Sequence, residues 1–339
     1  MTHTFDLAQI SQNINYFEPQ AVTQLSSSEL ETRLAVYMWS WGQQIAPAAA
    51  ATYLPENSFD VQRFLDFYLP FRIGSDFAAV SEASVRLLAV GTAHLHLYGT
   101  FLDFVLDSPD HASAVMEVTV ASFLFHAERV FAWLFPPSSP FWNRLNQLQI
   151  QTNQVLLKER PGSLNRIKPY ELAAYKQNAC RKMALFGHTH VIGLALLNGA
   201  PEQIPVLERC WDALMFLATI DDDVLDWPED YHNSTYTYLL TQVLLADPFR
   251  AELEAGHKPA VTEVDGALFC SDVVETLYLA AARELEEAEA LAHQIDCLAV
   301  ADLLREHSAE ARSRAVDISK RKLGAVIAMG ADKSERSRQ

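Results

Sequence analysis

The sequence predicts an all-α protein of roughly nine to twelve helices packed around one core. Alanine, leucine and glutamate dominate the chain, glycine accounts for only 12 of 339 residues, and no stretch shows the alternation of a strand. The hydrophobic content of 50% is enough for a large core, and no segment rich in proline, glycine and serine divides the chain. We therefore expect a single helical domain.

The expected domain boundaries follow from local composition. Residues 1–25 should form a loosely structured N-terminal arm and residues 26–325 the helical domain. Residues 326–339 should form a disordered tail, because the chain after Gly330 is polar and charged. The first helix is expected after residues 26–28, a run of three serines, since serine caps helices and Glu29 and Glu31 suit a first turn.

Prolines and turn residues divide the rest of the chain into further helices. Pro70 and Pro228 should each end a helix, and Trp227 should mark a bend, because a residue before proline is pushed away from helical geometry. The segment 108–110, Ser-Pro-Asp, should separate two more helices, with Asp110 capping the second. The expected helices cover about 58–69, 80–107, 110–134, 140–159, 169–198, 203–226, 234–246, 267–293 and 297–319.

Two short acidic motifs carry the functional information. The first is DFVLD at 103–107, the second is DDVLD at 222–226, and each closes a long apolar segment before a helix breaker. Residues i and i+4 share a helix face, so each motif directs two carboxylates the same way. Carboxylates in apolar surroundings are costly unless they are paired or bind a metal. Two such faces across a cavity would form an oxygen cage for Mg²⁺, which commonly also holds substrate phosphate.

Charge and cysteine content restrict the partners. The net charge of −17 argues against nucleic acid. One stretch is basic all the same, and an anionic ligand and a solvated face explain it equally well: Lys158, Arg160, Arg166, Lys168, Lys176, Arg181 and Lys182. Four cysteines without close spacing and an N-terminus without signal-peptide features predict a cytoplasmic protein. No apolar run is long enough for stable membrane insertion.

With these elements in place, the segment 215–226 resembles the second aspartate-rich motif of class I isoprenoid enzymes. Asp222, Asp223 and Asp226 match the DDxxD pattern of trans-prenyl diphosphate synthases. The segment 181–185 is similar to the helix that carries the diphosphate-binding lysine of those enzymes, which points to Lys182. The DxxxD form of both motifs is closer to squalene and phytoene synthases and to bacterial terpene synthases of the same fold. The resemblance covers residues 80–240.

The resemblance implies an antiparallel helical bundle with a central active-site cavity, and an enzyme that ionises a prenyl diphosphate. It implies Mg²⁺ as the cofactor, with three ions expected and Mn²⁺ as an alternative. Asp103, Asp107, Asp222 and Asp226 would be the catalytic residues and would ligate the metals, with Asp223 as a supporting ligand. Metal ions would neutralise the leaving diphosphate.

Several neighbouring residues have weaker assignments. Lys182 is the first choice for binding diphosphate, with Lys176 and Arg181 behind it, and the sequence leaves open which of them makes the contact. Asp110 and Asp230 are candidate extra ligands. Asp230 can equally be a helix cap, and Asp107 and Asp110 can also be caps because they flank Ser108-Pro109, although this is the weaker alternative for them. Asp221 is expected in a solvated or supporting position. Tyr236 and Tyr238 either close over the diphosphate or only pack.

Three functions compete. The leading expectation is a terpene synthase, a carbon–oxygen lyase that makes a hydrocarbon or alcohol from one prenyl diphosphate. The alternatives are a prenyltransferase of the squalene or phytoene synthase kind, which joins two prenyl diphosphates, and a non-catalytic helical scaffold. Chain elongation is disfavoured because the first motif lacks a doubled aspartate, Thr219 stands near the place of the usual glutamine, and residues 1–80 lack the glycine- and lysine-rich element that holds isopentenyl diphosphate. Substrate length and product skeleton stay open, and a homodimer is expected from the resemblance alone.

Overall fold

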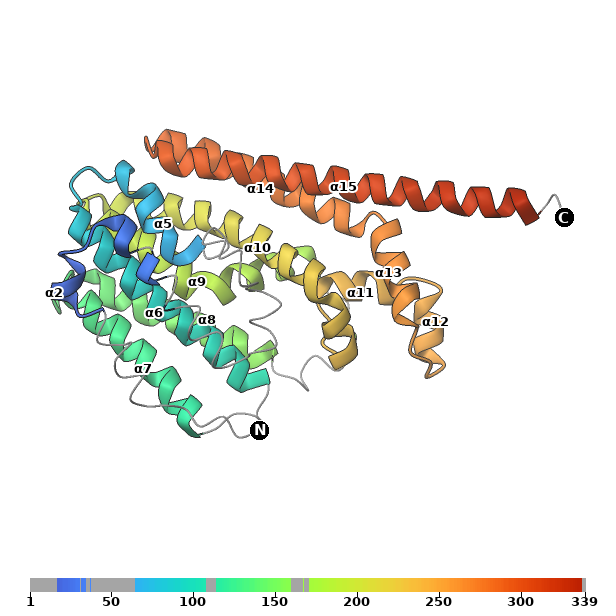
Figure 1. Ribbon diagram of the computed structural model, residues 1–339, viewed down its shortest axis with the longest axis horizontal. Coiled ribbons are helices and arrows are strands. Elements are labelled where there is room, and N and C mark those ends of the chain that lie inside the picture. The colour runs from blue at the N-terminus through green and yellow to red at the C-terminus, as the bar shows by residue number, and fades with distance from the viewer. Residues whose placement is uncertain are drawn as a thin grey trace. The chain divides into compact units, whose positions relative to one another are not determined.

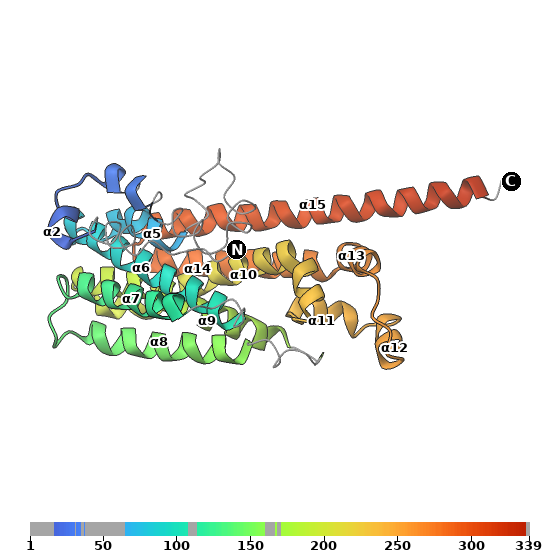
Figure 2. The ribbon, with the colours of Figure 1, turned by 60° about the horizontal axis from the view of Figure 1, so that its bottom comes forward.

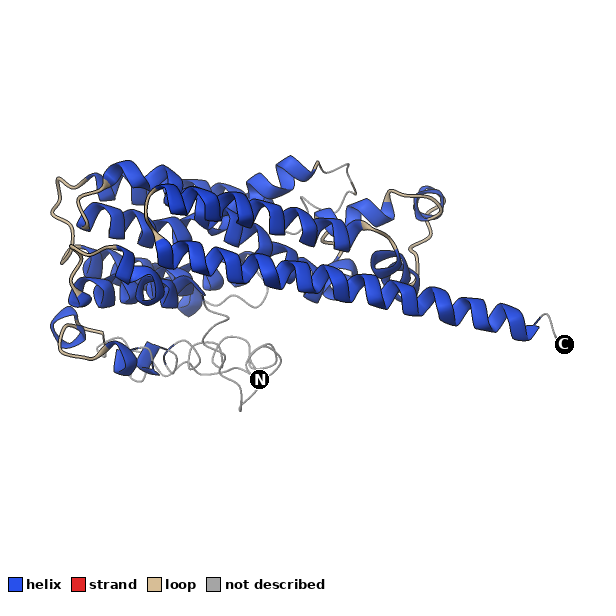
Figure 3. Cartoon of the chain, turned by 90° about the horizontal axis from the view of Figure 1, so that it is seen from above, coloured by secondary structure: helices blue, strands red, loops and turns tan. Residues whose placement is uncertain are grey.

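The computed structural model describes residues 17–30, 32–34, 37, 65–107, 114–159, 167 and 171–336. Within these ranges, the side chains of residues 65–68, 103, 104, 107, 114–118, 159 and 324–336 are not described. Every regular element of the described ranges is a helix, and they contain no strand (Figure 1, Figure 3). The predicted all-α fold class is confirmed.

The helices follow one another along the chain as α2 (Pro19–Val22), α5 (Leu65–Ile73), η2 (Gly74–Asp76), α6 (Glu82–Asp107), α7 (Ala114–Phe131), α8 (Pro140–Glu159), α9 (Leu172–Leu197), η3 (Pro201–Gln203), α10 (Ile204–Asn233), α11 (Tyr238–Leu244), α12 (Phe249–Glu254), α13 (Val261–Cys270), α14 (Val273–Gln294) and α15 (Leu298–Arg336). They belong to two compact units, which we describe separately. Unit 1 comprises residues 1–156 and 183–208, and unit 2 comprises residues 157–182 and 209–339. Helices α8, α9 and α10 contribute residues to both units.

In unit 1, α6 and α7 form an antiparallel pair. The rings of Phe101 on α6 and Phe123 on α7 lie 5.0 Å apart, while Gly91 on α6 packs against Phe131 near the other end of α7. Helix α6 ends at Asp107, as the sequence predicted, so the first acidic motif occupies its last two turns. Burial of most of the described apolar residues of α6 explains why this helix forms despite two internal glycines.

Gly99 of α6 is a sensitive packing position in unit 1. A Cβ atom built there would overlap the ring of Phe186, which is itself buried. We expect Gly99→Ala to lower the free energy of unfolding by about 1–3 kcal/mol, measured by urea denaturation, because the ring has to move in a filled core. Gly266, inside α13, has no atom within 4 Å of its would-be Cβ. The matched variant Gly266→Ala should therefore leave the protein as stable or stabilise it by up to about 1 kcal/mol. Equal effects of the two substitutions would contradict this assignment.

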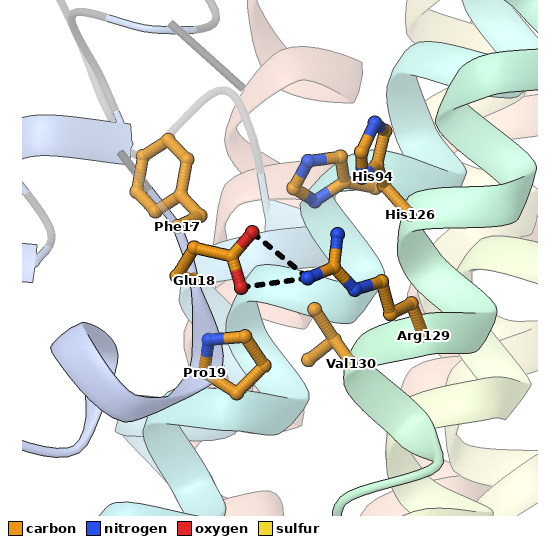
Figure 4. A pocket seen from close by; sticks show the side chains of 7 residues that line it. All are labelled: Phe17, Glu18, Pro19, His94, His126, Arg129 and Val130. Atoms are coloured by element: carbon orange, nitrogen blue, oxygen red, sulfur yellow. Dashed lines mark hydrogen bonds and ion pairs between the residues drawn. The ribbon is translucent and has the colours of Figure 1, made fainter. Parts of the chain in front are cut away.

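The N-terminal arm expected over residues 1–25 is corrected by the structure from residue 17 onward. Phe17 and Val22 are buried, and Arg129 of α7 donates two hydrogen bonds, of 2.9 and 2.8 Å, to the carboxylate of Glu18 (Figure 4). Residues 1–16 lie outside the described residues. The predicted helix start after the serines is confirmed, because Ser26 and Glu29 cap each other's backbone N–H groups. Sequence composition missed this packing because, among the described residues 17–25, only Phe17, Pro19 and Val22 are buried.

A small pocket lies between this segment and helices α6 and α7. His94 is fully buried there, its Nδ1 lies 2.8 Å from the carbonyl oxygen of Val90, and its ring faces that of His126 at 5.8 Å (Figure 4). Burial lowers the pKa of His94 to about 4, the bond to Val90 opposes this shift, and His126 adds to it. Burial also lowers the pKa of His126.

The neutral His94 should make the protein sensitive to acid. Its folded-state pKa lies below the ordinary value of 6.5, so the unfolded chain binds the extra proton and stability is lost as the pH falls from about 6.5 toward 4. We expect a loss of about 2 kcal/mol between pH 7.5 and 5, as an order of magnitude. In His94→Gln this part of the pH dependence should disappear, whereas the exposed control His257→Gln should keep it. Identical urea midpoints of both variants at every pH would contradict the prediction.

In unit 2, α14 and α15 form an antiparallel hairpin and lie side by side along the whole of α14 (Figure 1, Figure 2). The turn between them contains Asp296 with a φ of 56°, a left-handed conformation that aspartate tolerates better than most residues. Helix α15 continues to Arg336, so the prediction of a disordered tail from residue 326 is wrong as far as 336. The alanines at 325, 328 and 331 favour a helix here. The sequence-based prediction had relied on the polar residues after Gly330 instead.

Helix ends at prolines were predicted less well. Helix α10 continues through Pro228 to Asn233, and α5 contains Pro70 in its interior, so both predicted ends are wrong. An internal proline costs about 3 kcal/mol. In α10, burial of Trp227 and Tyr231 on either side of Pro228 offsets that cost.

The helix predicted over 267–293 is instead divided at 271–272 into α13 and α14. None of the described helices is long and apolar enough to cross a membrane.

Candidate metal and diphosphate site

The second acidic motif lies within unit 2, on the part of α10 that follows residue 209. Asp222, Asp226 and Asp230 are four residues apart and share one helix face. Asp222 is exposed, whereas Oδ1 of Asp226 is buried and has no hydrogen-bond partner. Because Pro228 does not end the helix, the motif and Asp230 are held in one continuous helix rather than at a helix end.

Asp223 points to a different side of α10 and is almost fully buried. The hydroxyl group of Tyr175, on α9, donates a hydrogen bond of 2.9 Å to Oδ2 of Asp223. Burial raises the pKa of the Asp223 carboxyl well above its ordinary value, and the bond from Tyr175 opposes this. This contact directs the Asp223 carboxyl toward α9, and its role as a supporting metal ligand stays a prediction.

The like charges on α10 favour a cation at this face. Burial, and after it the charges of Asp222 and Asp230, raise the pKa of Asp226 to about 8. A buried carboxylate oxygen without a donor is costly unless a proton or a metal ion satisfies it. Carboxylate oxygens are the ligands that Mg²⁺ and Ca²⁺ prefer, so this donor set fits a hard divalent ion.

The α10 face supplies only part of a metal cage. Among residues whose side chains the structure describes, no three or more Asp, Glu, His or Cys residues are grouped as a metal site. The side chains of Asp103 and Asp107 are outside this set, although α6 carries both residues, and Asp110 lies outside the described residues altogether. The predicted ligands of the first motif therefore stay predictions.

The three basic candidates lie on the first three turns of α9, within unit 2. Lys176 forms an ion pair with Glu284 on α14, and its Nζ lies 6.0 Å from the centre of the Phe216 ring. Arg181 is exposed and Lys182 is half-buried. Lys182 follows Tyr175 by seven residues, which places both on one face of α9 with Lys182 about 10 Å further along.

Helices α9 and α10 run antiparallel in this region. Tyr175 meets Asp223, while the thiol of Cys180 lies 3.6 Å from the carbonyl oxygen of Asp212. Advancing along α9 toward Lys182 therefore leads away from Asp222 along α10. Tyr175 thus lies beside Asp223, whereas Lys182 lies two turns further along α9, on the side away from the acidic motif. The sequence spacing had not indicated this arrangement.

Several side chains around the motif were missed by sequence reasoning. Tyr278 of α14 donates a hydrogen bond of 3.0 Å to Oδ1 of Asp221, and Arg314 of α15 forms an ion pair with the same carboxylate. Tyr238, which the sequence had named, stacks on Tyr175 with ring centres 4.9 Å apart, and its closure over a diphosphate stays a prediction. These partners lie 48 to 93 residues from their aspartates, and no local pattern marks them.

Comparison with known proteins places the fold. No protein-family model and no curated protein matches the chain. A polyprenyl synthase from Roseobacter denitrificans is similar in structure, with 16% identity, a TM-score of 0.60, and coverage of 85% of this chain and 100% of that one. A polyprenyl synthase from Caulobacter crescentus, crystallised with calcium and isoprenyl diphosphate, has 14% identity, a TM-score of 0.60, and coverage of 86% and 97%.

A decaprenyl diphosphate synthase from Rhodobacter capsulatus is also similar, with 16% identity, a TM-score of 0.55, and coverage of 91% of this chain and 96% of that one. At such low identities the likeness concerns the fold, and it extends over nearly the whole length of each of these synthases. The chain therefore has the all-helical isoprenoid synthase fold, as the resemblance of its aspartate motifs to class I isoprenoid enzymes had indicated.

Proposed function

We propose that this protein is a metal-dependent enzyme acting on prenyl diphosphates, and that it joins two of them as a prenyltransferase. The observation that carries the proposal is the α10 face, where Asp222 is exposed beside Asp226 with its buried, unpartnered oxygen. Such a face in a fold shared with polyprenyl synthases fits divalent-metal binding of a diphosphate better than a purely structural role.

Each residue has a defined part in this proposal. Asp222 and Asp226 bind divalent metal from α10, and Asp103 and Asp107 supply carboxylates from α6. Lys182 donates charge-assisted hydrogen bonds to phosphate oxygens, with Lys176 and Arg181 as alternatives. When bound, Mg²⁺ neutralises the diphosphate as the carbon–oxygen bond breaks. Apolar side chains around the reacting carbon would keep water away from it.

A terpene synthase acting on one prenyl diphosphate is the second candidate. The absence of a doubled aspartate in the first motif and of a glycine- and lysine-rich element in residues 1–80 favours it. The similar solved structures are polyprenyl and decaprenyl diphosphate synthases, and this favours the prenyltransferase. We give the prenyltransferase precedence, because a fold likeness over nearly the whole length of these synthases outweighs two missing local patterns.

The two candidates differ in their need for a second substrate. Purified protein would be incubated with Mg²⁺ and geranyl, farnesyl or geranylgeranyl diphosphate, each alone, in pairs, and together with isopentenyl diphosphate. Pyrophosphate release and mass spectrometry of extracted products would be followed, with EDTA as a control. If the protein is a prenyltransferase, a longer product should form only when two prenyl diphosphates are present. A hydrocarbon or alcohol from a single substrate would establish the terpene synthase instead.

A scaffold without catalysis would give a third result. In that case no substrate combination yields product, and inorganic pyrophosphate with Mg²⁺ shows no binding by calorimetry. Metal-dependent pyrophosphate binding without product would instead mean that the correct prenyl substrate was not among those supplied.

A further inference from the structure

The three consecutive aspartates of α10 point in three directions. Successive residues of a helix are rotated by about 100°, so Asp221, Asp222 and Asp223 cannot share a face. Asp222 is exposed, Asp223 is held by Tyr175 of α9, and Asp221 is held by groups from α14 and α15. The exposed carboxylate of the proposed metal face is thus flanked on both sides by carboxylates that neighbouring helices hold in place.

The contacts of Asp221 form a compact cluster within unit 2. Tyr278 is buried and donates its 3.0 Å hydrogen bond to Oδ1 of Asp221. The guanidinium of Arg314 pairs with the same oxygen and lies 5.9 Å from the centre of the Tyr278 ring. Arg314 is itself held by Glu310, one turn earlier on α15, at 2.6 Å. The side chain of Asp221 is 23% exposed, so this pair is better shielded from water than most surface ion pairs.

We propose that Arg314 and Tyr278 are positioning residues for the metal site, acting through Asp221 to set the rotation of α10 about its axis. A rotation of α10 would turn Asp222 and Asp226 together away from their common ligand. Holding Asp221 on one flank and Asp223 on the other prevents this rotation. Substitution of a residue that orients a metal ligand without touching the metal commonly lowers metal affinity by 10–100-fold. The inference rests on the proposed function, since it assigns these residues to that site.

The chain contains a matched control for Arg314. Arg312 lies two residues earlier on α15 and donates hydrogen bonds of 2.7 and 2.5 Å to Glu286 of α14. It therefore also joins α15 to α14, but the structure gives it no contact with α10 among the described residues. If looser packing of α15 weakens Mg²⁺ binding, substitution of either arginine should weaken it. If α10 is no longer positioned, only substitution of Arg314 should weaken it.

The test measures binding of inorganic pyrophosphate to the whole protein by calorimetry as a function of Mg²⁺ concentration. For Arg314→Met we expect the Mg²⁺ concentration at half-saturation to rise about ten-fold. Arg314→Lys should recover part of this loss, and Tyr278→Phe should show a smaller rise. Arg312→Met should stay within about two-fold of the unsubstituted protein. Circular dichroism would verify that each variant is helical.

Two results would overturn the proposal. Equal shifts in Arg314→Met and Arg312→Met would reduce Arg314 to a packing role. Tighter Mg²⁺ binding in Arg314→Met would mean that its positive charge merely opposes the metal, because removal of a cation makes the face more negative. If Arg314→Met does not fold, Asp221→Asn and Tyr278→Phe carry the same test. No Mg²⁺-dependent pyrophosphate binding by the unsubstituted protein would refute the proposed function itself, and the inference with it.

Discussion

Asp222→Asn is expected to abolish turnover of prenyl diphosphates while the protein stays folded. Asp222 is exposed on the carboxylate face of α10, so the substitution removes a proposed metal ligand without opening the core. Asparagine keeps the shape of the side chain but lacks the charge that would hold a divalent ion near the diphosphate. We expect kcat/KM to fall by at least about 1,000-fold, the scale of losing one strong electrostatic contact in the transition state. Pyrophosphate release would be measured with the substrate pair that the unsubstituted protein uses.

Glu202→Gln is the control for Asp222→Asn. Glu202 is an exposed carboxylate in η3, outside α10, and its loss should change kcat/KM by less than about three-fold. The far-ultraviolet circular dichroism of both variants should equal that of the unsubstituted protein. Near-normal activity of Asp222→Asn would remove α10 from the catalytic site, and an equal loss in both variants would point to a general effect of charge.

Asp226→Asn is expected to separate stability from function. Without metal, the buried oxygen of Asp226 lacks a donor, and burial raises the pKa of this carboxyl from 3.8 to about 8. The neutral amide needs no proton to be buried, so at neutral pH the metal-free variant should melt about 2–4 °C higher than the unsubstituted protein. The same substitution removes a proposed ligand, and Mg²⁺-dependent pyrophosphate binding should be lost.

The pH dependence gives a second readout for Asp226. Because its folded-state pKa lies above the unfolded value, the folded state retains a proton that the unfolded chain releases, and stability decreases as the pH rises from about 4 to 8. Asp226→Asn should lack this contribution, while the exposed control Glu202→Gln should keep it. Thermal midpoints in EDTA between pH 5 and 9 would measure both slopes. A lower midpoint for Asp226→Asn at pH 8 would mean that the carboxylate has a stabilising partner.

Most helices of this protein can be found from short-range signals. Helix α6 was predicted to within about two residues of its observed ends, and α8 has the predicted bounds, because caps and breakers such as Ser108-Pro109 act within one helical turn. The two wrong helix ends at prolines have the same cause. Pro70 and Pro228 were expected to end helices, yet the side chains around each proline are buried against other parts of the chain, and this burial outweighs the local cost of a proline.

The spacing of Asp222 and Asp226 was likewise visible in the sequence, because residues four apart on a helix share a face wherever that helix lies. Which aspartate of the motif faces solvent and which is buried was not visible. Tyr175, Tyr278 and Arg314 come from three other helices, and their contacts with α10 depend on how those helices pack. The sequence by itself thus determined the helices and the carboxylate face, since both follow from local periodicity. Only the tertiary structure decided how each carboxylate is held, because hydrogen bonds and ion pairs between residues far apart in the chain form only after the helices have packed.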